Sequence, residues 1–174
     1  MKNNIVLIGM PGCGKSTVGV VLAKVLGYRF LDADLVIQEQ EHRLLCEIIE
    51  QDGYEAFDRI ENQVNTAISP QNTVIATGGS VVYGKEAMEH YRNIGVVVYL
   101  KLPYEEIAHR LGDLTKRGVS MKKGQTLQEL YDERQPLYEQ YADVVITETS
   151  HSIWETAFLI RDAAGPFLAS RKDA

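Results

Sequence analysis

Short apolar runs alternate along the chain with longer segments whose apolar residues recur at helical spacing. The first run, residues 5–8, reads Ile-Val-Leu-Ile and is typical of a strand that is buried on both faces. The next segment, residues 17–26, places apolar residues three and four apart and ends before Gly27, where a helix C-cap is expected. This order predicts that the chain opens with a strand, a turn and a helix, the first unit of a parallel sheet.

The same pattern continues toward the C-terminus. Further strands are predicted at residues 28–32, 72–76, 95–100 and 143–147. Helices are predicted at residues 84–92, 103–111, 126–138 and 151–164, and the last of them carries Trp154, which we expect in the core. Strands that alternate with helices predict an α/β fold, in which helices cover both faces of a parallel sheet.

The segment between the second and third strands, about residues 33–62, is longer than a crossover between parallel strands requires. Helical periodicity extends over residues 34–68 and breaks near residues 41–43 and again at residues 52–53, so two or three helices are expected. We interpret this excursion as the substrate-binding part of a single domain, residues 1–174, because the length of the chain fits one well-buried domain.

Composition narrows the range of functions. The chain has 18 Lys and Arg against 24 Asp and Glu, a net charge of −6, and no apolar run of membrane-spanning length. Nucleic-acid binding requires a clustered basic surface, and the first strand begins too early to leave room for a signal peptide. Two cysteines are too few for a disulfide framework. We therefore expect a monomeric cytoplasmic protein that binds small molecules, and neither nucleic acid nor a membrane.

The turn after the first strand carries the most specific motif. Residues 9–17 read Gly-Met-Pro-Gly-Cys-Gly-Lys-Ser-Thr and fit G-x-x-x-x-G-K-[ST] between a strand and a helix. Glycines let backbone N–H groups converge on phosphate oxygens, and the helix N-terminus adds the positive end of its dipole. We expect Lys15 to reach the β- and γ-phosphates and Ser16 to bind Mg²⁺. The alternative is a glycine-rich turn with an incidental lysine. The predicted nucleotide contacts are Gly12, Cys13, Gly14, Lys15, Ser16 and Thr17.

Chemistry-bearing residues also follow the second and third strands. Ligands of parallel α/β sheets bind outside the carboxyl ends of the strands. Asp32 is therefore expected to hold Mg²⁺, directly or through water, and Asp34 to accept the proton of an acceptor hydroxyl; alternatively, Asp34 only caps the next helix. Gly78 and Gly79 would allow the backbone to approach a ligand closely, although a tight turn also explains them.

Residues 113–125 combine two glycines and four cations with few apolar side chains. This is the composition expected of a mobile lid, which we place at about residues 112–125. An ordinary solvated loop is the alternative.

Taken together, these motifs resemble the shikimate kinase family of P-loop enzymes, and the resemblance covers nearly the whole chain. Members of this family transfer the γ-phosphoryl group of ATP to a hydroxyl of shikimate, a step of aromatic amino acid biosynthesis. The resemblance implies a three-layer α/β/α fold with a five-stranded parallel sheet of order 2-3-1-4-5, and ATP and Mg²⁺ as cofactors. It rests on the phosphate loop, Asp32-Ala33-Asp34, Asp52-Gly53, Phe57 to Glu61, Gly78-Gly79, Arg110, Arg117 and Glu133 to Tyr138.

The resemblance also implies roles for individual residues. Lys15 and Arg117 would stabilise the transferring phosphoryl group, while Ser16 and Asp32 would hold Mg²⁺. Asp34 would bind and activate the acceptor hydroxyl. Arg110 would lie against adenine and Arg134 would contact the substrate carboxylate. Phosphoryl transfer requires these three contributions: positioning, charge neutralisation and an oriented nucleophile.

The chain departs from the family pattern at three places in the acceptor site. Asp58 stands where members usually have an arginine that shares the substrate carboxylate, and the adjacent Arg59 would replace it only by turning inward. Ser80 replaces a third glycine after Gly78-Gly79. In the lid, the usual Arg-Pro-Leu-Leu reads Arg117-Gly118-Val119-Ser120.

Asp58 leaves the acceptor open. An anion beside a substrate carboxylate is repulsive, so an Asp58 that faces the ligand would favour a zwitterion, such as the hydroxy amino acid homoserine. If Asp58 points elsewhere, shikimate remains the expected substrate. A third interpretation is a nucleotide-binding switch without an acceptor, which the combination of Asp34, Arg134 and the lid cations disfavours.

Overall fold

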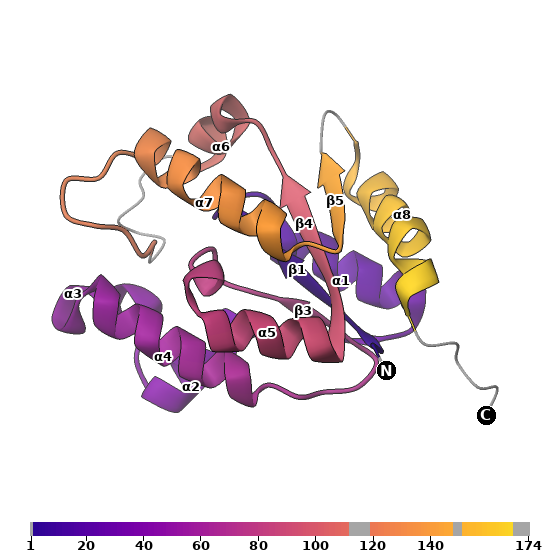
Figure 1. The fold of residues 1–174 in the computed structure, drawn as a ribbon, viewed down its shortest axis with the longest axis horizontal. Helices are drawn as coiled ribbons and strands as arrows, with labels where there is room; N and C mark the ends of the chain where they lie inside the picture. Colours follow the sequence, from indigo (N-terminus) through magenta and orange to yellow (C-terminus); the bar gives the residue numbers. More distant parts are fainter. Residues whose placement is uncertain (1, 112–118, 148–150, 169–174) are drawn as a thin grey trace.

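Five parallel strands form one sheet at the centre of the protein (Figure 1). The computed structural model describes residues 2–111, 119–147 and 151–168. The strands follow the order β2-β3-β1-β4-β5 across the sheet, as the family resemblance implied. Their bounds are β1 (Asn4–Ile8), β2 (Arg29–Asp32), β3 (Thr73–Ala76), β4 (Gly95–Lys101) and β5 (Val144–Thr147).

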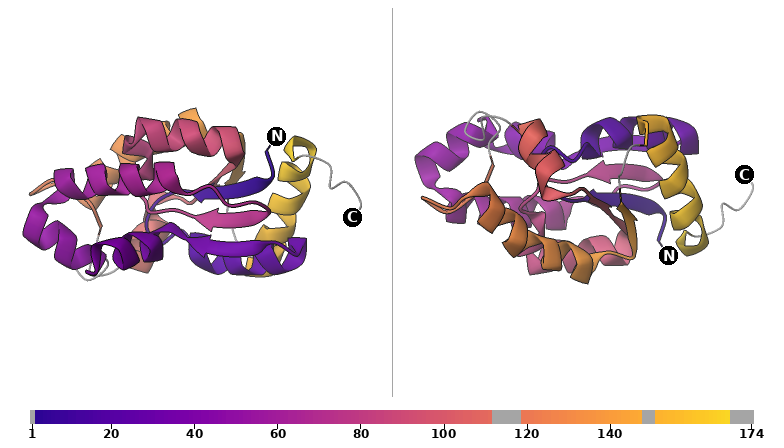
Figure 2. Two further views of the ribbon diagram at one scale, coloured as in Figure 1. Left: turned by 90° about the horizontal axis from the view of Figure 1, so that it is seen from below. Right: turned by 90° about the horizontal axis from the view of Figure 1, so that it is seen from above.

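Helices cover both faces of the sheet, which gives the expected three layers. One face is covered by α1 and α8, and α5 and α7 lie on the other (Figures 1 and 2). The helices are α1 (Lys15–Leu26), α2 (Ala33–Glu41), α3 (Leu45–Asp52), α4 (Tyr54–Ala67), α5 (Lys85–Ile94), α6 (Tyr104–Leu111), α7 (Leu127–Tyr141) and α8 (Ile153–Ala164), with short 3₁₀ turns η1 (Val81–Tyr83) and η3 (Gly165–Phe167).

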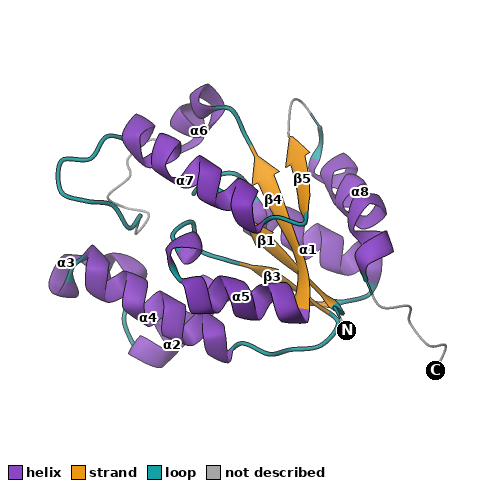
Figure 3. Cartoon of the chain, viewed as in Figure 1, coloured by secondary structure: helices purple, strands orange, loops and turns teal. Residues whose placement is uncertain are grey.

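The excursion between β2 and β3 consists of three helices, α2, α3 and α4, joined by short connections (Figure 3). Its breaks lie where the sequence pattern places them. At the first break His42 adopts a left-handed conformation with φ 53°, and at the second Gly53 has φ 85°, which glycine adopts without steric cost. The helices stand at the carboxyl ends of β2 and β3, beside the phosphate loop that follows β1.

The prediction for Trp154 is wrong, because its side chain is 49% exposed. Helix α8 carries apolar residues on two faces. The face with Ala157 and Ile160 is buried, whereas Trp154 lies over Phe158 on the outer side, with ring centroids 6.2 Å apart. Helical spacing alone does not show which of two apolar faces the rest of the chain covers.

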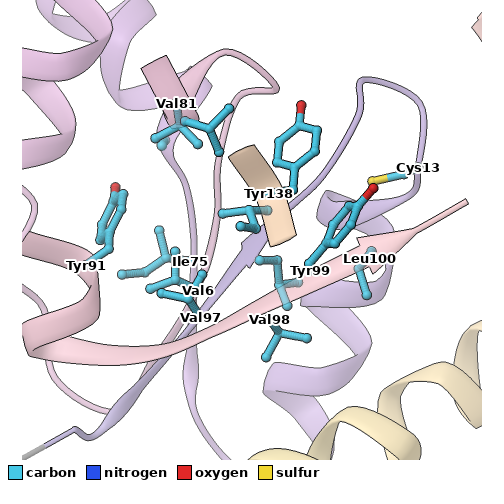
Figure 4. Close-up of a cluster of buried hydrophobic side chains, with 14 of the residues drawn as sticks. Val6, Cys13, Ile75, Val81, Tyr91, Val97, Val98, Tyr99, Leu100 and Tyr138 are labelled. Carbon is cyan, nitrogen blue, oxygen red and sulfur yellow. The ribbon is translucent and has the colours of Figure 1, made fainter. Parts of the chain in front are cut away.

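The core extends to the carboxyl ends of the strands. Figure 4 shows buried side chains of β1, β3 and β4 with Tyr91, Tyr99 and Tyr138 around them. The rings of Tyr99 and Tyr138 stack with centroids 5.0 Å apart, and the Tyr138 hydroxyl donates a hydrogen bond of 2.6 Å to the carbonyl of Gly79. The packed core therefore fixes the position of the paired-glycine turn.

At the opposite end of the sheet, Asn4 joins the strands that hold this core. Its side chain is fully buried. Nδ2 donates to the carbonyls of Pro70, at 2.9 Å, and Ile94, at 3.0 Å, while Oδ1 accepts from the backbone N–H of Thr73 at 3.0 Å. The Asn4 side chain thus binds backbone groups at the starts of β3 and β4, the two strands that flank β1.

We expect Asn4→Ala to lower the free energy of unfolding by at least about 2 kcal/mol, because each buried polar group left unpaired costs about 1–3 kcal/mol. Denaturant unfolding measures the change. Asn93→Ala, at an exposed position of α5, is the control and should remain within about 0.5 kcal/mol of the unchanged protein. Equal stability of the two variants would show that the Asn4 bonds do not hold the sheet together.

Candidate active site

A cavity of about 470 Å³ lies at the carboxyl ends of β1, β2 and β3. Its walls come from the phosphate loop, the helical excursion, the paired-glycine turn, the segment before α7, and α7 itself. The lining residues are Pro11, Gly12, Gly14, Lys15, Ser16, Thr17, Asp34, Leu45, Phe57, Glu61, Thr77, Gly78, Gly79, Ser80, Val119, Ser120 and Arg134.

The phosphate loop has the backbone conformation that the motif implies. Gly12 and Gly14 have φ of 79° and 95°, which side chains of L-residues rarely tolerate. Helix α1 begins directly after them, so its unpaired N–H groups point into the loop, where they favour an anion. The Lys15 ammonium lies over the loop and donates to the carbonyls of Gly9, at 2.8 Å, and Met10, at 3.0 Å.

Ser16 and Asp32 form a pair of oxygen ligands beside the loop. The Ser16 hydroxyl donates to Asp32 Oδ2 at 2.6 Å. Mg²⁺ prefers oxygen donors and is often held by one or two protein ligands together with phosphate oxygens, so this pair fits the ion. The described residues contain no group of three or more His, Cys, Asp or Glu side chains that would hold a metal without phosphate.

Asp34 is a partly exposed residue whose carboxyl group lies deep in the cavity wall. Asp32, and not Asp34, is the N-cap of α2: its Oδ1 accepts from the Asp34 N–H at 3.1 Å. The alternative in which Asp34 merely caps the helix is therefore wrong. Burial raises the pKa of Asp34 to about 6, the nearby Asp32 charge raises it as well, and Lys15 opposes both effects.

Glu61 lies behind Asp34 and is 1% exposed. Ser80 Oγ donates to its Oε2 at 2.5 Å. Burial raises the pKa of Glu61 to about 8, and the charge of Asp34 contributes in the same direction. The sequence motif contains Glu61, but sequence reasoning did not assign it to the site; its spacing of four residues from Phe57 on a helix was the available signal.

Gly78 and Gly79 are required because other groups approach them closely. A Cβ atom on Gly78 would lie 2.2 Å from Glu61 Oε1 and 2.9 Å from Asp34 Oδ1. A Cβ atom on Gly79 would lie 2.7 Å from the ring of Pro11 and 3.0 Å from Arg134 Nη1. The two glycines thus let the carboxyl groups and the guanidinium converge on one cavity.

Arg134 is the cation of the acceptor side, and its side chain is 1% exposed. Nη2 donates to the carbonyl of Ser120, Nε donates to the Tyr83 hydroxyl at 3.2 Å, and the guanidinium lies 5.1 Å from the centre of the Tyr83 ring. Among the described residues no carboxylate forms an ion pair with Arg134. A buried cation with an unpaired charge favours an anionic ligand.

Comparison with known proteins identifies the family. A family model described as shikimate kinase matches residues 11–163. The chain belongs to the shikimate kinase family.

Individual relatives agree with this result. A shikimate kinase of Clostridium botulinum is 37% identical over 151 residues, which cover 86% of this chain and 90% of the relative. Shikimate kinase 2 of Escherichia coli is 35% identical over 155 residues, with 86% and 89% covered. Among solved structures, shikimate kinase from Acinetobacter baumannii in complex with shikimate has a TM-score of 0.86 at 29% identity and 97% coverage of both chains. That from Aquifex aeolicus has a TM-score of 0.80 at 28% identity, with 94% of this chain and 97% of the other covered.

Asp58 and Ser120, which belong to two of the three departures from the family pattern, contact each other. Asp58 is half-buried and accepts a hydrogen bond from Ser120 Oγ at 2.7 Å; it lines a neighbouring cavity of about 280 Å³ instead of the main one. Burial raises the pKa of Asp58, although the Ser120 bond and Arg134 lower it. The sequence indicates Ser120 only as part of the altered lid motif and predicts no contact for it. Arg59 is exposed and is not brought to the cavity.

The remaining predicted contacts lie at the nucleotide side or outside the described residues. Cys13 is buried with its Sγ 3.7 Å from Lys15 Nζ, and it does not line the cavity. Arg110 is exposed, forms an ion pair of 2.8 Å with Glu106 and lies near Gly12. Arg117 and residues 112–118 of the predicted lid lie outside the described residues.

We expect Gly78→Ala to reduce kcat roughly 10²-fold, because the new methyl group would displace the carboxyl groups of Asp34 and Glu61, and a shift of about 1 Å in a catalytic group costs about this much. Steady-state kinetics measures the loss. Gly165→Ala is the matched control, since Gly165 has helical φ and no atom near its Cβ position. An unchanged kcat for Gly78→Ala would contradict the close approach at Gly78.

Proposed function

We propose that this protein transfers the γ-phosphoryl group of ATP to a hydroxyl of shikimate, giving shikimate 3-phosphate and ADP. One observation supports the acceptor above all. The buried Arg134 guanidinium, without a carboxylate partner among the described residues, lies in the wall of the cavity that also holds the phosphate loop. Shikimate is a small acceptor with a carboxylate and a hydroxyl. Its carboxylate would bind Arg134 while its hydroxyl lies toward the phosphate loop. The relatives support the same acceptor.

The donor end positions the triphosphate. The loop N–H groups and the start of α1 bind the phosphates, and the Lys15 ammonium neutralises charge that develops on the transferring group. Ser16 and Asp32 would hold Mg²⁺, which would supply further positive charge to the triphosphate. In this proposal Arg110 lies against adenine, and Arg117 joins Lys15 at the phosphoryl group.

The acceptor end orients the nucleophile. Gly78 and Gly79 leave room for the substrate, and Arg134 binds its carboxylate. The acceptor oxygen forms a bond to the γ-phosphorus as the bridging P–O bond to ADP breaks, and Asp34 takes the hydroxyl proton. The elevated pKa of Asp34 makes it a stronger base than an ordinary aspartate.

A second acceptor class rests on Asp58. The anion in place of the usual arginine favours a zwitterionic hydroxy amino acid such as homoserine. Because Asp58 accepts a hydrogen bond from Ser120 and lines the neighbouring cavity, shikimate remains the better supported substrate.

We further propose that the protein acts as a cytoplasmic monomer. None of its described helices is long and apolar enough to cross a membrane.

An acceptor screen tests this function. ADP release is followed with shikimate, homoserine, gluconate and no acceptor, at fixed ATP and Mg²⁺. We expect shikimate to give the highest kcat/KM by a wide margin. A higher kcat/KM for homoserine than for shikimate would show that the acceptor is a hydroxy amino acid. Slow ADP release that does not depend on the acceptor would indicate a nucleotide switch.

We expect Lys15→Ala to reduce kcat by about 10²-fold or more, because it removes charge stabilisation from the transferring phosphoryl group. Lys85→Ala, at an exposed position of α5, serves as the control. Retention of more than about a tenth of kcat would contradict the role of Lys15.

We expect kcat/KM to fall as the pH drops through about 6, because Asp34 is protonated below its pKa of about 6 and cannot then accept a proton. A pH–rate profile between pH 5 and 8 measures this. Asp34→Asn should lose about 10²-fold in kcat with little change in KM for ATP, while Asp132→Asn on the exposed side of α7 should behave like the unchanged protein. A flat profile down to pH 5 would exclude Asp34 as the base.

A further inference from the structure

Two carboxyl oxygens lie beside Gly78 with no hydrogen-bond donor among the described residues. Asp34 Oδ1 and Glu61 Oε1 are the buried side-chain oxygens that lack a partner within the described ranges. They lie 2.9 Å and 2.2 Å from the same point, the position of a Cβ atom on Gly78. The two oxygens are therefore directed into one small space that solvent does not reach.

Two ionised carboxylates are not stable in that space without a cation. Arg134 donates to Ser120 and Tyr83, and the Lys15 ammonium donates to two loop carbonyls. The position where family members usually carry arginine holds Asp58, a further anion. No described cation therefore donates a hydrogen bond to either oxygen, although Lys15 acts on the charge of Asp34 and Arg134 on that of Glu61.

Each element that packs around Glu61 contributes a group that acts on its charge. Asp34 on α2 and Asp58 on its own helix α4 disfavour ionisation, whereas Arg134 on α7 and the Ser80 hydroxyl favour it. The charge of Glu61 also acts on Tyr91 of α5, whose hydroxyl donates to Asn65 Oδ1 at 2.5 Å. Burial is the largest effect, and it favours the neutral acid.

We propose that Glu61 is a neutral carboxylic acid in the folded protein at neutral pH and donates its hydrogen from Oε1 to Asp34 Oδ1. Ser80 Oγ donates to Glu61 Oε2, which leaves Oε1 as the oxygen that carries the hydrogen. This bond supplies the missing donor for Asp34 Oδ1 and fixes the carboxylate so that Oδ2 remains available to the acceptor hydroxyl. Glu61 is thus a positioning residue, and this role rests on the proposed function, whereas the protonation of Glu61 does not.

The arrangement connects two departures from the family pattern. Aspartate at position 58 places a negative charge near Glu61, and serine at position 80 adds a hydroxyl that donates to one of the Glu61 oxygens. The charge of Asp58 favours the protonated acid. The Ser80 hydroxyl favours ionisation, but it occupies Oε2 and so leaves Oε1 as the oxygen that carries the hydrogen. The residues at both positions therefore act on the same carboxyl group, that of Glu61.

Glu61→Gln tests the protonation without any assay of activity. Between pH of about 4.5 and 8 the folded protein keeps a Glu61 proton that the unfolded chain releases, so this carboxyl group makes stability fall as pH rises. The variant lacks that dependence, so its Tm minus that of the unchanged protein should be larger at pH 8 than at pH 5. The infrared difference spectrum at pH 7 should also show a carboxylic acid C=O band that the variant lacks. No such band, together with a Tm difference that does not grow with pH, would overturn the proposal.

Kinetics tests the positioning role. Glu61→Gln retains an N–H donor toward Asp34, so kcat should remain within about threefold, whereas Glu61→Ala should lose about tenfold or more in kcat with KM for ATP unchanged. Glu55→Gln, an exposed glutamate on the same helix, is the matched control. Full kcat in a folded Glu61→Ala would overturn the positioning role, and a severe loss in Glu61→Gln would show that Glu61 acts as an anion. If no acceptor is phosphorylated, the proposed function fails, while the Tm and infrared results still decide the protonation.

Discussion

The pairing of Ala76 with two neighbours determines the site. In the parallel register Ala76 lies opposite Leu7 of β1 and opposite Asp32 of β2, and Thr77 continues the contact through a hydrogen bond of 2.9 Å to the Leu7 carbonyl. Three strands therefore end at one level. The phosphate loop, the Asp32–Asp34 pair and the paired glycines each follow one of these ends, so a shift of register would separate the donor and acceptor halves of the cavity.

The donor and acceptor halves of the cavity differ in their charged groups. The donor side presents N–H groups and the Lys15 ammonium to phosphate, while the acceptor side combines the buried Arg134 with the carboxyl groups of Asp34 and Glu61. Burial strengthens the electrostatic interactions in the cavity and raises the pKa values of both carboxyl groups. Because the Glu61 side chain is buried, a proton is the simplest positive partner that its carboxyl group can have. The folded core behind Gly79 holds the arrangement in place.

The sequence predicts what depends on local pattern. The strand order follows from the family resemblance, and the loop conformation and the breaks in the excursion follow from glycines and periodicity. Contacts between distant segments do not have such signals: Asp58 turns to Ser120, which lies 62 residues away, and Trp154 is exposed because α1 covers the other face of α8. Glu61 belongs to a recognised motif, but its pairing with Asp34 depends on how α4 packs beside Gly78.

The most direct test of the account compares shikimate with its methyl ester as acceptors for the unchanged protein. The ester has the same hydroxyls and lacks the negative charge that Arg134 is proposed to bind. A hydrogen bond to a charged group contributes about 1.5–3 kcal/mol, so we expect kcat/KM for the ester to be about 10- to 100-fold lower. Equal values for the two acceptors would contradict the central claim, that the buried guanidinium holds a carboxylate while Asp34 directs a hydroxyl to the γ-phosphate.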